Sequence, residues 1–528
     1  MLVRTSLPRL RLAHPHARSI RVFVSWTELF VPYHQPLRSF APYSSERCRE
    51  SHSAFLTWDT IRFRGHCPSE HQSNRTIFVT GTLTPRIWLE CQRHTRSPET
   101  KMNVLVTGAT GLIGSAVTLR LAREGHHVIG VARHPNRQPN VVRWVALDIA
   151  TARRPEQWFS ILNGIEAVVN CAGVLQDGRR EDIEGVHTAG VGALFDACEQ
   201  CGVGRVVHFS AIGVDRAQPS SFSATKYAGD SHLMSLALDW VILRPSVVLG
   251  RAAFGASALM RALASLPVVP LMPDTQLLQV VQLGDVLATV CFFLRPNAPS
   301  RLALELVGPD RLQMREIIAQ YRSWYGWPPA RYFAVPRVLA KLVYWLGDLL
   351  GALEWRPPVR TNAALEVARG ACGDPKRWTS LTGIQPKSLA DALAAELPTI
   401  QDKWFAPLYL IKPIVFIVLS TFWIGTGIIS ITFGYRSGAD LMRNTGAGFL
   451  SGPAVLAGAL ADIAVGSGIG WRRLTRCALY GALVLSLFYL AAGTILRPDL
   501  WGEPLGPLLK ILPILALQLI ALAILDER

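Results

Sequence analysis

The sequence predicts two kinds of structure in one chain. An α/β domain with a doubly wound parallel sheet and a small C-terminal lobe comes first, and an all-α bundle of about four transmembrane helices follows. A glycine-rich turn joins an apolar strand to a helix just after Met102, and long uncharged runs occur after residue 405. Half of the residues are hydrophobic and the mean hydropathy is +0.24, which is high for a wholly soluble protein.

The first 101 residues differ from the rest of the chain. They hold 14 Arg, one Lys and seven acidic residues, and so carry +8 of the formal net charge of +16. Apolar residues recur there at no sustained period, so residues 1–101 are a poor candidate for a domain. Three explanations stay open: a disordered basic arm, a transit-like segment, or upstream sequence before a start at Met102. The third is preferred because the first clear strand begins at Met102.

Charge and cysteine content restrict the partners that we expect. The body of the chain has no basic helix or Lys/Arg block, so we expect no nucleic-acid partner. The nine Cys are scattered, and Cys198 and Cys201 form their one CxxC pair. Cys198 and Cys201 are three apart, but no second pair completes a ligand set, so no metal site is predicted.

A dinucleotide site is predicted at the start of the α/β domain. The apolar run Val104–Val106 suits a buried parallel strand, and Gly108, Gly111 and Gly114 follow it in a GxxGxxG pattern. Such glycines permit a tight turn, a close approach of the backbone to a pyrophosphate, and packing of helix on strand, while the helix N-terminus attracts the phosphates. The pattern predicts a Rossmann-type NAD(P)-binding domain over residues 102–250.

The choice of cofactor depends on the end of the second strand. An Asp or Glu there would bind the ribose hydroxyls, but this sequence has Arg133. A guanidinium group suits the 2′-phosphate of NADP. The sequence therefore favours NADP, with NAD as the alternative.

These motifs resemble the short-chain dehydrogenase/reductase superfamily, in its extended or atypical branch, over residues 102 to about 400. The nearest likeness is to the subgroup that includes the nucleotide-binding accessory subunit of respiratory complex I. TGATGLIG resembles the cofactor loop, Asp148 follows the third strand, and Asn170–Gly173 resembles the fourth-strand motif. Ser210 stands at the usual active-site serine. The resemblance implies a cofactor site made of Thr107, Gly108, Thr110, Gly111, Leu112, Ile113, Gly114, Arg133, Asp148, Ala172, Gly173 and Lys226.

One departure from the superfamily affects the chemistry. Its catalytic pair is Tyr-x-x-x-Lys, and this sequence has Phe222 at the tyrosine position and Lys226 at the lysine position. Tyr227 lies about 100° further around the helix, so it does not replace the missing phenol. The resemblance implies Ser210 and Lys226 as catalytic residues, and Asp215 is a further candidate to replace the phenol.

Two kinds of function therefore stay open. The first is an NAD(P)-dependent oxidoreductase, or an epimerase/dehydratase-like enzyme, acting on an apolar or quinone-like small molecule. The second is a non-catalytic nucleotide-binding, sensing or assembly module with a partner in a membrane complex. Residues 251–400 would form the small substrate-side lobe. Four of its tryptophans could line an apolar pocket, belong to an ordinary core or lie against the bilayer, namely Trp324, Trp327, Trp345 and Trp355.

The C-terminal part is predicted to cross a lipid bilayer. Pro413–Phe433 has 21 residues without a charge and Cys477–Leu496 has 20, each enough to span the hydrocarbon core. Thr445–Gly470 and Pro504–Leu525 are weaker candidates. The arginines between the predicted helices favour both termini, and hence the nucleotide domain, on the cytoplasmic side of an inner (plasma) membrane.

Residues 405–528 resemble the DoxX-like membrane family. The run Trp501–Lys510 resembles the start of that family's final helix, and Ala461-Asp462 resembles its second-helix acid. A carboxylate inside a membrane is costly and often functional. Asp462 is therefore a candidate for contact with a proton or a headgroup, unless it pairs two helices or lies at the interface.

Overall fold

The computed structural model of the protein describes residues 56–57, 60–61, 101–135, 142–176, 178, 182–444, 448–504 and 506–526. The chain divides into two units, Met1–Arg96 and Ser97–Arg528. The described part of the first unit consists of strands β1 (Leu56–Thr57) and β2 (Thr60–Ile61), which pair antiparallel. The three explanations for residues 1–101 concern a segment that lies almost wholly outside the described residues.

The nucleotide domain is built on one seven-stranded sheet with the order β12-β8-β7-β6-β3-β4-β5. Every neighbouring pair of strands is parallel. The strands are β3 (Asn103–Thr107), β4 (His127–Ala132), β5 (Arg143–Ala146), β6 (Ala167–Asn170), β7 (Arg205–Phe209), β8 (Trp240–Pro245) and β12 (Leu302–Leu306). The chain order reverses between β3 and β6, which is the position where doubly wound sheets bind dinucleotides. The predicted α/β fold class is confirmed.

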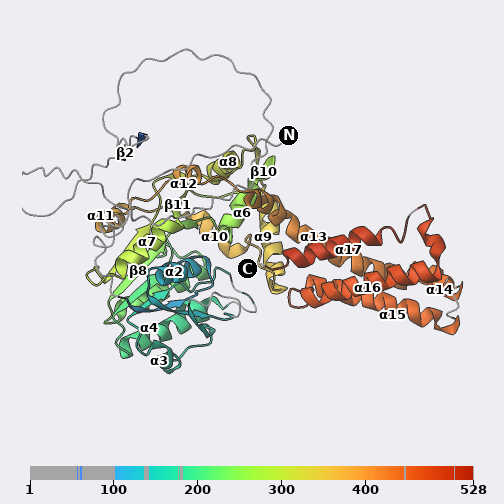
Figure 1. Ribbon diagram of the computed structural model, residues 1–528, viewed down its shortest axis with the longest axis horizontal. Helices are drawn as coiled ribbons and strands as arrows, with labels where there is room; N and C mark the ends of the chain where they lie inside the picture. Colours follow the sequence, from blue (N-terminus) through green and yellow to red (C-terminus); the bar gives the residue numbers. More distant parts are fainter. Residues whose placement is uncertain are drawn as a thin grey trace, which may run out of the picture. The chain divides into compact units, whose positions relative to one another are not determined.

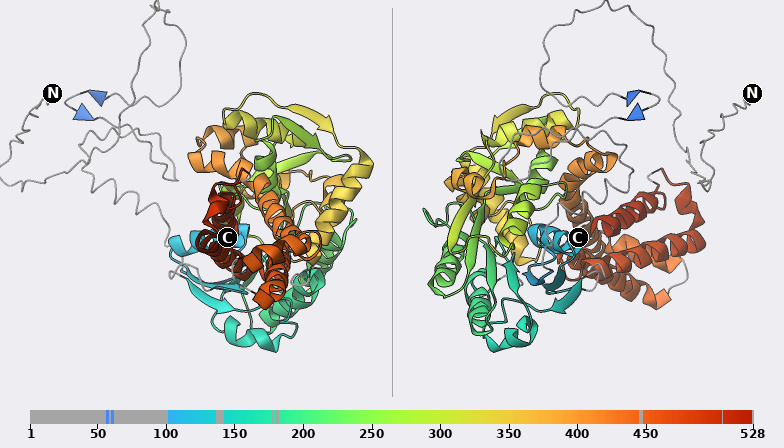
Figure 2. Two further views of the ribbon diagram at one scale, coloured as in Figure 1. Left: turned by 90° about the vertical axis from the view of Figure 1, so that its right-hand side faces the viewer. Right: turned by 60° about the vertical axis from the view of Figure 1, so that its left-hand side comes forward.

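Helices cover both faces of this sheet (Figures 1 and 2). One face carries α2 (Leu112–Arg123), α7 (Leu283–Phe293) and α11 (Lys376–Thr382), and the other carries α3 (Glu156–Leu162), α4 (Gly190–Gln200) and α5 (Ser221–Ser235). Strand β3 supplies both cores because successive side chains point to opposite faces. Val104 and Val106 enter the first core, and Leu105 enters the second.

A second lobe has its own core. Its strands are β9 (Val247–Leu249), β11 (Leu278–Gln282) and β13 (Arg311–Leu312) in one sheet, with β10 (Val268–Leu271) and β14 (Arg331–Ala334) as a parallel pair. Its helices are α6 (Ala256–Leu263), α8 (Met314–Trp324), α9 (Arg337–Ala352), α10 (Thr361–Arg369) and α12 (Leu389–Ala394). Because α7, β12 and α11 return to the large sheet, the stretch 251–400 contributes to both cores.

The four tryptophans noted in the sequence do not gather around one pocket. Trp324 and Trp327 pack beside the core of the second lobe. Trp345 on α9 is exposed, and Trp355 packs against the core of the helical bundle. They are therefore divided among core, surface and bundle.

Three helices are long and apolar enough to cross a membrane, among the residues that the structure describes. They are α13 (Ile400–Ile431), the stretch Gly448–Gly470 that contains α15 (Ser451–Gly470), and α16 (Thr475–Leu496). The fourth predicted span contains the apolar helix α17 (Ile511–Ile524), which has only 14 residues. Such a helix is about 21 Å long, shorter than the ~30 Å hydrocarbon core. Helix α14 (Tyr435–Asn444) and the short turns η2 (Gly448–Leu450) and η3 (Pro498–Trp501) complete the bundle.

Helix α13 joins the second lobe to the bundle without a break. It has 32 residues and is therefore about 48 Å long. Near its start, Ala406 is buried in the core of the lobe, and Asp402 lies 3.7 Å from Arg261 of α6. Further along, Leu419 and Trp423 are buried in the bundle core. The lobe and the bundle thus share one continuous helix.

Candidate functional site

The loop between β3 and α2 forms a bare backbone cradle. Gly108 has a φ of +62°, and a Cβ atom there would lie 2.7 Å from the carbonyl oxygen of Cys171. A Cβ atom at Gly114 would lie 2.1 Å from the carbonyl oxygen of Gly108. Gly111 caps α2 and donates its N–H to Gly108 O at 2.9 Å. The first N–H groups of a helix have no partner within it, so this cradle suits a pyrophosphate.

Polar contacts fix the cradle against the next strand. Thr107 Oγ1 donates to Asn170 Oδ1 at 2.6 Å, and both side chains are buried. The same amide oxygen accepts the N–H of Ala172 at 3.2 Å. These bonds join the ends of β3 and β6, the two strands at which the order of the sheet reverses.

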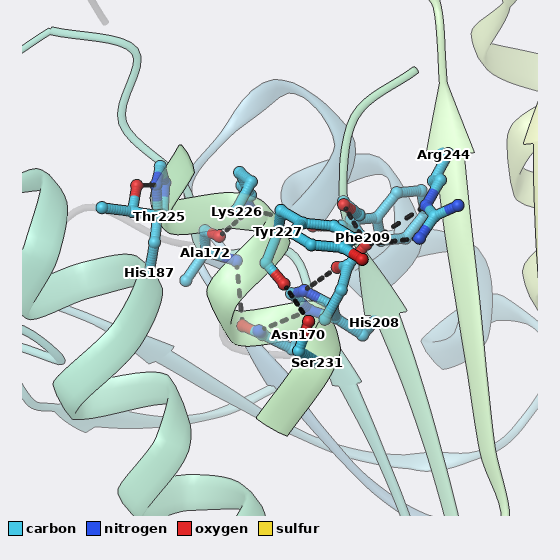
Figure 3. A network of polar contacts seen from close by, with 12 residues as sticks. Asn170, Ala172, His187, His208, Phe209, Thr225, Lys226, Tyr227, Ser231 and Arg244 are labelled. Carbon is cyan, nitrogen blue, oxygen red and sulfur yellow. Dashed lines mark hydrogen bonds and ion pairs between the residues drawn. The ribbon is translucent and has the colours of Figure 1, made fainter. Parts of the chain in front are cut away.

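Lys226 of α5 lies beside Ala172, just past the end of β6 (Figure 3). Its Nζ donates to the carbonyl oxygens of Ala172 at 3.1 Å and Phe209 at 2.9 Å. A Cβ atom at Gly173 would lie 3.2 Å from this Nζ, and one at Gly108 would lie 2.8 Å from the N of Ala172. The predicted residues of the β3 and β6 loops therefore adjoin Lys226. Burial lowers the pKa of Lys226 to about 8, although the nearby Asp230 carboxylate opposes this shift.

Phe222 precedes Lys226 by one turn of α5 and packs against a histidine. The rings of Phe222 and His187 meet edge to face with centroids 5.5 Å apart. His187 Nε2 accepts the N–H of Val174 at 3.0 Å, and Nδ1 lies 3.0 Å from Thr225 Oγ1. Burial, and after it the Lys226 cation, lowers the pKa of His187 well below its usual range. His187 is thus neutral with its proton on Nδ1, and no side chain at the tyrosine position offers a phenol.

Ser210 is held in an ionic network below the end of β7. Its Oγ donates to Asp230 Oδ2 at 2.9 Å. Arg244 donates to the same oxygen from Nε at 3.1 Å and from Nη2 at 3.0 Å, and its Nη1 donates to Asp215 at 2.6 Å. Both candidates for a substitute proton donor, Ser210 and Asp215, are therefore bound to other groups.

His208 continues this network toward the cradle. The amide of Asn170 lies 2.9 Å from His208 Nδ1 and donates to it, so the ring proton is on Nε2, which lies 3.4 Å from Asp230 Oδ1. Burial alone would raise the pKa of Asp230, but His208, Arg244 and Ser210 more than offset it and hold that pKa below its usual value. A line of polar side chains thus runs from Thr107 to Arg244 beneath the crevice.

Arg133 and Asp148 occupy the same edge of the sheet as the cradle. Arg133 is the first residue after β4 and is exposed. Asp148 comes two residues after β5, and its Oδ1 accepts the N–H of Ala150 at 3.2 Å. Thr110 precedes α2, and Leu112 and Ile113 begin it. Since parallel strands end at one edge, all these predicted positions surround the crevice, and their roles toward a cofactor stay predictions.

Sequence reasoning missed two residues of the site. Asp230 had a signal in the sequence, since it follows Lys226 by four residues and so lies on the same face of α5. The structure shows that it is fully buried. The place of Arg244 in an otherwise apolar buried strand also indicates a buried acidic partner. His187 had no signal in the sequence. The π-helical turn Gly185–Ala189 brings it to Lys226, and such turns often occur at functional sites.

The bundle contains a separate cavity of about 340 Å³. Apolar side chains of α13, α14, α15 and α17 form most of its wall. Asp462 and Tyr489 also line it, and the Tyr489 hydroxyl donates to Asp462 Oδ1 at 2.9 Å. The predicted intramembrane acid is therefore buried in this wall with a phenol as its partner.

Two family models match this chain. Residues 104–298 match the NAD dependent epimerase/dehydratase family, and residues 420–519 match the DoxX-like family. An uncharacterized protein of Mycobacterium tuberculosis is 30% identical over 219 residues, which cover 41% of this chain but only 23% of that protein.

Two further relatives have descriptive names. Ceramide reductase of Caulobacter vibrioides is 25% identical over 219 residues, which cover 41% of this chain and 68% of that protein. Subunit 9 of the NADH dehydrogenase [ubiquinone] 1 alpha subcomplex of Rattus norvegicus is 24% identical over 328 residues, which cover 59% of this chain and 78% of that protein. The chain therefore combines an NAD-binding Rossmann domain of the epimerase/dehydratase and short-chain dehydrogenase/reductase type with a DoxX-like domain.

Proposed function

We propose that this chain is a membrane-anchored NADP(H)-binding protein that holds its cofactor without the Tyr-Lys proton relay. The observation that carries the proposal is the cradle at Gly108 and Gly114, closed against Ala172 directly above the buried Lys226. A Cβ atom on either glycine would collide with backbone atoms of Cys171 or Gly108, so the cradle forms only with glycine at both positions. A nicotinamide cofactor bound there would supply hydride transfer.

Different residues of the chain would bind different parts of the cofactor. The N-terminus of α2 would bind the pyrophosphate, and Lys226 would hold the nicotinamide ribose. Arg133 would bind the 2′-phosphate, because a guanidinium group pairs well with a phosphate. Asp148 would contact the adenine. NAD is the alternative cofactor, and it would gain nothing from Arg133.

Three features favour binding over rapid turnover. Phe222 has no proton to give, Ser210 donates to Asp230, and Asp215 is paired with Arg244. A role in sensing or assembly would fit this arrangement. The name of the rat relative, a subunit of NADH dehydrogenase [ubiquinone], supports a partner in a membrane complex.

A reductase is the second candidate, and one observation favours it. The pKa of Lys226 is lowered to about 8, so its ammonium group can release a proton near neutral pH. Lys226 Nζ would give that proton to a carbonyl oxygen while hydride reaches the carbonyl carbon. The name of the Caulobacter relative, ceramide reductase, supports an apolar substrate.

The basic loop between α15 and α16 supports a cytoplasmic nucleotide domain. Arg473 in this loop pairs with Glu354 of the second lobe at 2.7 Å, so the loop lies on the same side as the lobe. Positively charged loops stay in the cytoplasm. We therefore place the nucleotide domain on the cytoplasmic side of an inner (plasma) membrane.

The test is a fluorescence titration of the full chain in lipid nanodiscs with NADPH and NADH. We expect tighter binding of NADPH, and Arg133→Asp should weaken it by roughly tenfold to 100-fold, as expected for lost charge-assisted bonds, and spare NADH. Turnover is then measured with 9,10-phenanthrenequinone and decanal. Binding without turnover supports the first candidate, and turnover supports the second. A folded chain that binds neither nucleotide would overturn both.

A further inference from the structure

Helix α9 carries an apolar stripe that the described residues leave uncovered. At about 100° per residue, its exposed large apolar side chains fall on one arc of roughly 120°. Val338 is 82% exposed and Trp345 is 59% exposed. The other members are between 41% and 49% exposed, and they include Leu342, Leu346, Leu349 and Leu353. Soluble surfaces seldom expose so many large apolar side chains side by side.

The opposite face of α9 is firmly packed. Ala340, Gly347 and Gly351 are buried there. A Cβ atom at Gly347 would lie 1.9 Å from the carbonyl oxygen of Val359, and one at Gly351 would lie 2.7 Å from Cζ of Arg360. The small residues let the following segment approach the helix backbone closely. The stripe is therefore held outward and cannot turn into the lobe.

The C-terminal end of α9 is fixed to the edge of the bundle. The indole N–H of Trp355 donates to the carbonyl oxygen of Gly470, the last residue of α15, at 2.8 Å. Arg472 stacks over the Trp355 ring at 5.5 Å, and its N–H donates to Leu353 O at 3.3 Å. Since the ends of membrane spans lie at the bilayer surface, α9 ends at that level.

The direction of α9 fits the same surface. In Figure 1 the yellow helix α9 runs crosswise to the bundle helices, and the left view of Figure 2 agrees. A helix crosswise to membrane spans, at the level where they end, lies along the bilayer plane. Near the start of α13, Trp404 is also strongly exposed, and tryptophan favours membrane interfaces.

We infer that α9 is an interfacial helix that lies on the bilayer surface with its apolar stripe among the upper acyl chains. Lipid is the occupant of the stripe, because the end of α9 is bonded to the segment that joins the candidate spans α15 and α16. Lys341 flanks the stripe on the polar side, where its ammonium group can reach lipid phosphates. The second lobe would thereby be held down on the membrane at α9 as well as through α13.

Photocrosslinking of the full chain in phosphatidylcholine and phosphatidylglycerol nanodiscs tests this inference. Leu342 is replaced by the photoreactive residue p-benzoylphenylalanine, and adducts are identified by mass spectrometry after irradiation. We expect lipid adducts at position 342. A matched control places the same residue at Leu381 on α11, a leucine that is also exposed but belongs to the nucleotide domain, and it should give no lipid adduct.

Other outcomes would overturn the inference. Adducts to a peptide of a second chain would make the stripe a protein interface, and absence of adducts would make it water-exposed. As a second measurement, Trp345 and Leu349 are replaced together by Ser in the chain that carries the label at position 342. Lipid adducts should then fall at least fivefold while the unfolding temperature stays within about 2 °C, because surface substitutions change stability little.

Discussion

The Phe222 ring meets the His187 ring edge to face at a centroid distance of 5.5 Å, one helical turn before Lys226. This contact decides how the candidate site can work. The superfamily that the sequence resembles has a tyrosine at this position. Here the residue is a phenylalanine, whose ring has no acidic proton. The residue beside it is a histidine that burial keeps neutral. Lys226 is therefore the titratable group that the site retains at its usual place.

Restoring the phenol should add the missing proton donor. Phe222→Tyr places a hydroxyl four residues before Lys226, on the same face of α5. General acid catalysis typically contributes ~10²–10⁴-fold, so we expect NADPH-dependent reduction of 9,10-phenanthrenequinone to rise at least 100-fold. NADPH affinity should stay within about threefold, because the substitution keeps the aromatic ring beside His187 and adds only a hydroxyl group. Phe222→Leu serves as the control and should leave the rate at its original level. Equal rates in the original chain and in Phe222→Tyr would mean that the proton comes from another group.

A methyl group in the cradle should abolish tight cofactor binding. In Gly114→Ala the Cβ atom would lie 2.1 Å from Gly108 O, so backbone must move. Overpacking of this kind costs about 1–3 kcal/mol, and NADPH affinity should fall roughly tenfold to 100-fold. Gly284→Ala on α7 is the matched control, since a Cβ atom there meets nothing within 4 Å. The cradle would not be the cofactor site if both variants bound NADPH equally well in the same titration.

Cofactor binding should weaken as the pH rises through about 8. The pKa of Lys226 is lowered to about 8 by burial, so its Nζ is cationic below that pH and loses its charge above it. An anionic cofactor favours the cation, so affinity should be highest below pH 8 and fall toward pH 9.5. The loss should be about tenfold, the size of one hydrogen bond to a charged group. Titrations at several pH values measure it. Lys226→Arg keeps its charge over this range, so its binding curve should be flat, and a fall equal to that of the original chain would remove Lys226 from the explanation.

The sequence predicted the features that local pattern determines. The apolar run at Val104–Val106 and the spacing of Gly108, Gly111 and Gly114 fix a strand, a turn and a helix within one short segment. Successive parallel strands then end at one edge, which is why the ends of β4, β5 and β6 could be assigned to the crevice. The three long apolar helices were equally local, because length and a scarcity of charges are enough to identify them, although Asp462 made one of them a weaker candidate.

Long-range contacts could not be predicted in the same way. Strand β12 (Leu302–Leu306) completes the large sheet by pairing with β8, but its sequence does not show which sheet it joins. His187 reaches Lys226 through a π-helical turn, which has no sequence signal. The pairing of Asp230 with Arg244 joins a helix to a strand, and the closeness of α9 to Gly470 joins segments more than a hundred residues apart.

Loss of the buried charge at Asp230 should destabilise the nucleotide domain. Asp230 is fully buried, and its Oδ2 accepts hydrogen bonds from Arg244 and Ser210. Asp230→Asn leaves the Arg244 guanidinium with Asp215 as its remaining anionic partner, and breaking a buried pair costs about 3–5 kcal/mol. At roughly 2–4 °C per kcal/mol for a domain of this size, the unfolding temperature at pH 7 should fall by at least 6 °C in differential scanning fluorimetry.

The pH dependence of this loss identifies its cause. The folded-state pKa of Asp230 lies below its usual value, so the carboxylate stabilises the fold above the unfolded pKa and ceases to do so as the pH falls through the folded one. The decrease in unfolding temperature caused by Asp230→Asn should therefore be the same at pH 7 and pH 5. It should shrink only below about pH 4, where the carboxyl group of the unfolded chain begins to gain its proton. Asp196→Asn provides the control, because Asp196 pairs with His232 at the surface and exposed pairs contribute at most about 1 kcal/mol. A deficit at Asp230 no larger than that at Asp196 would mean that the network beneath the crevice only positions side chains and does not stabilise the fold.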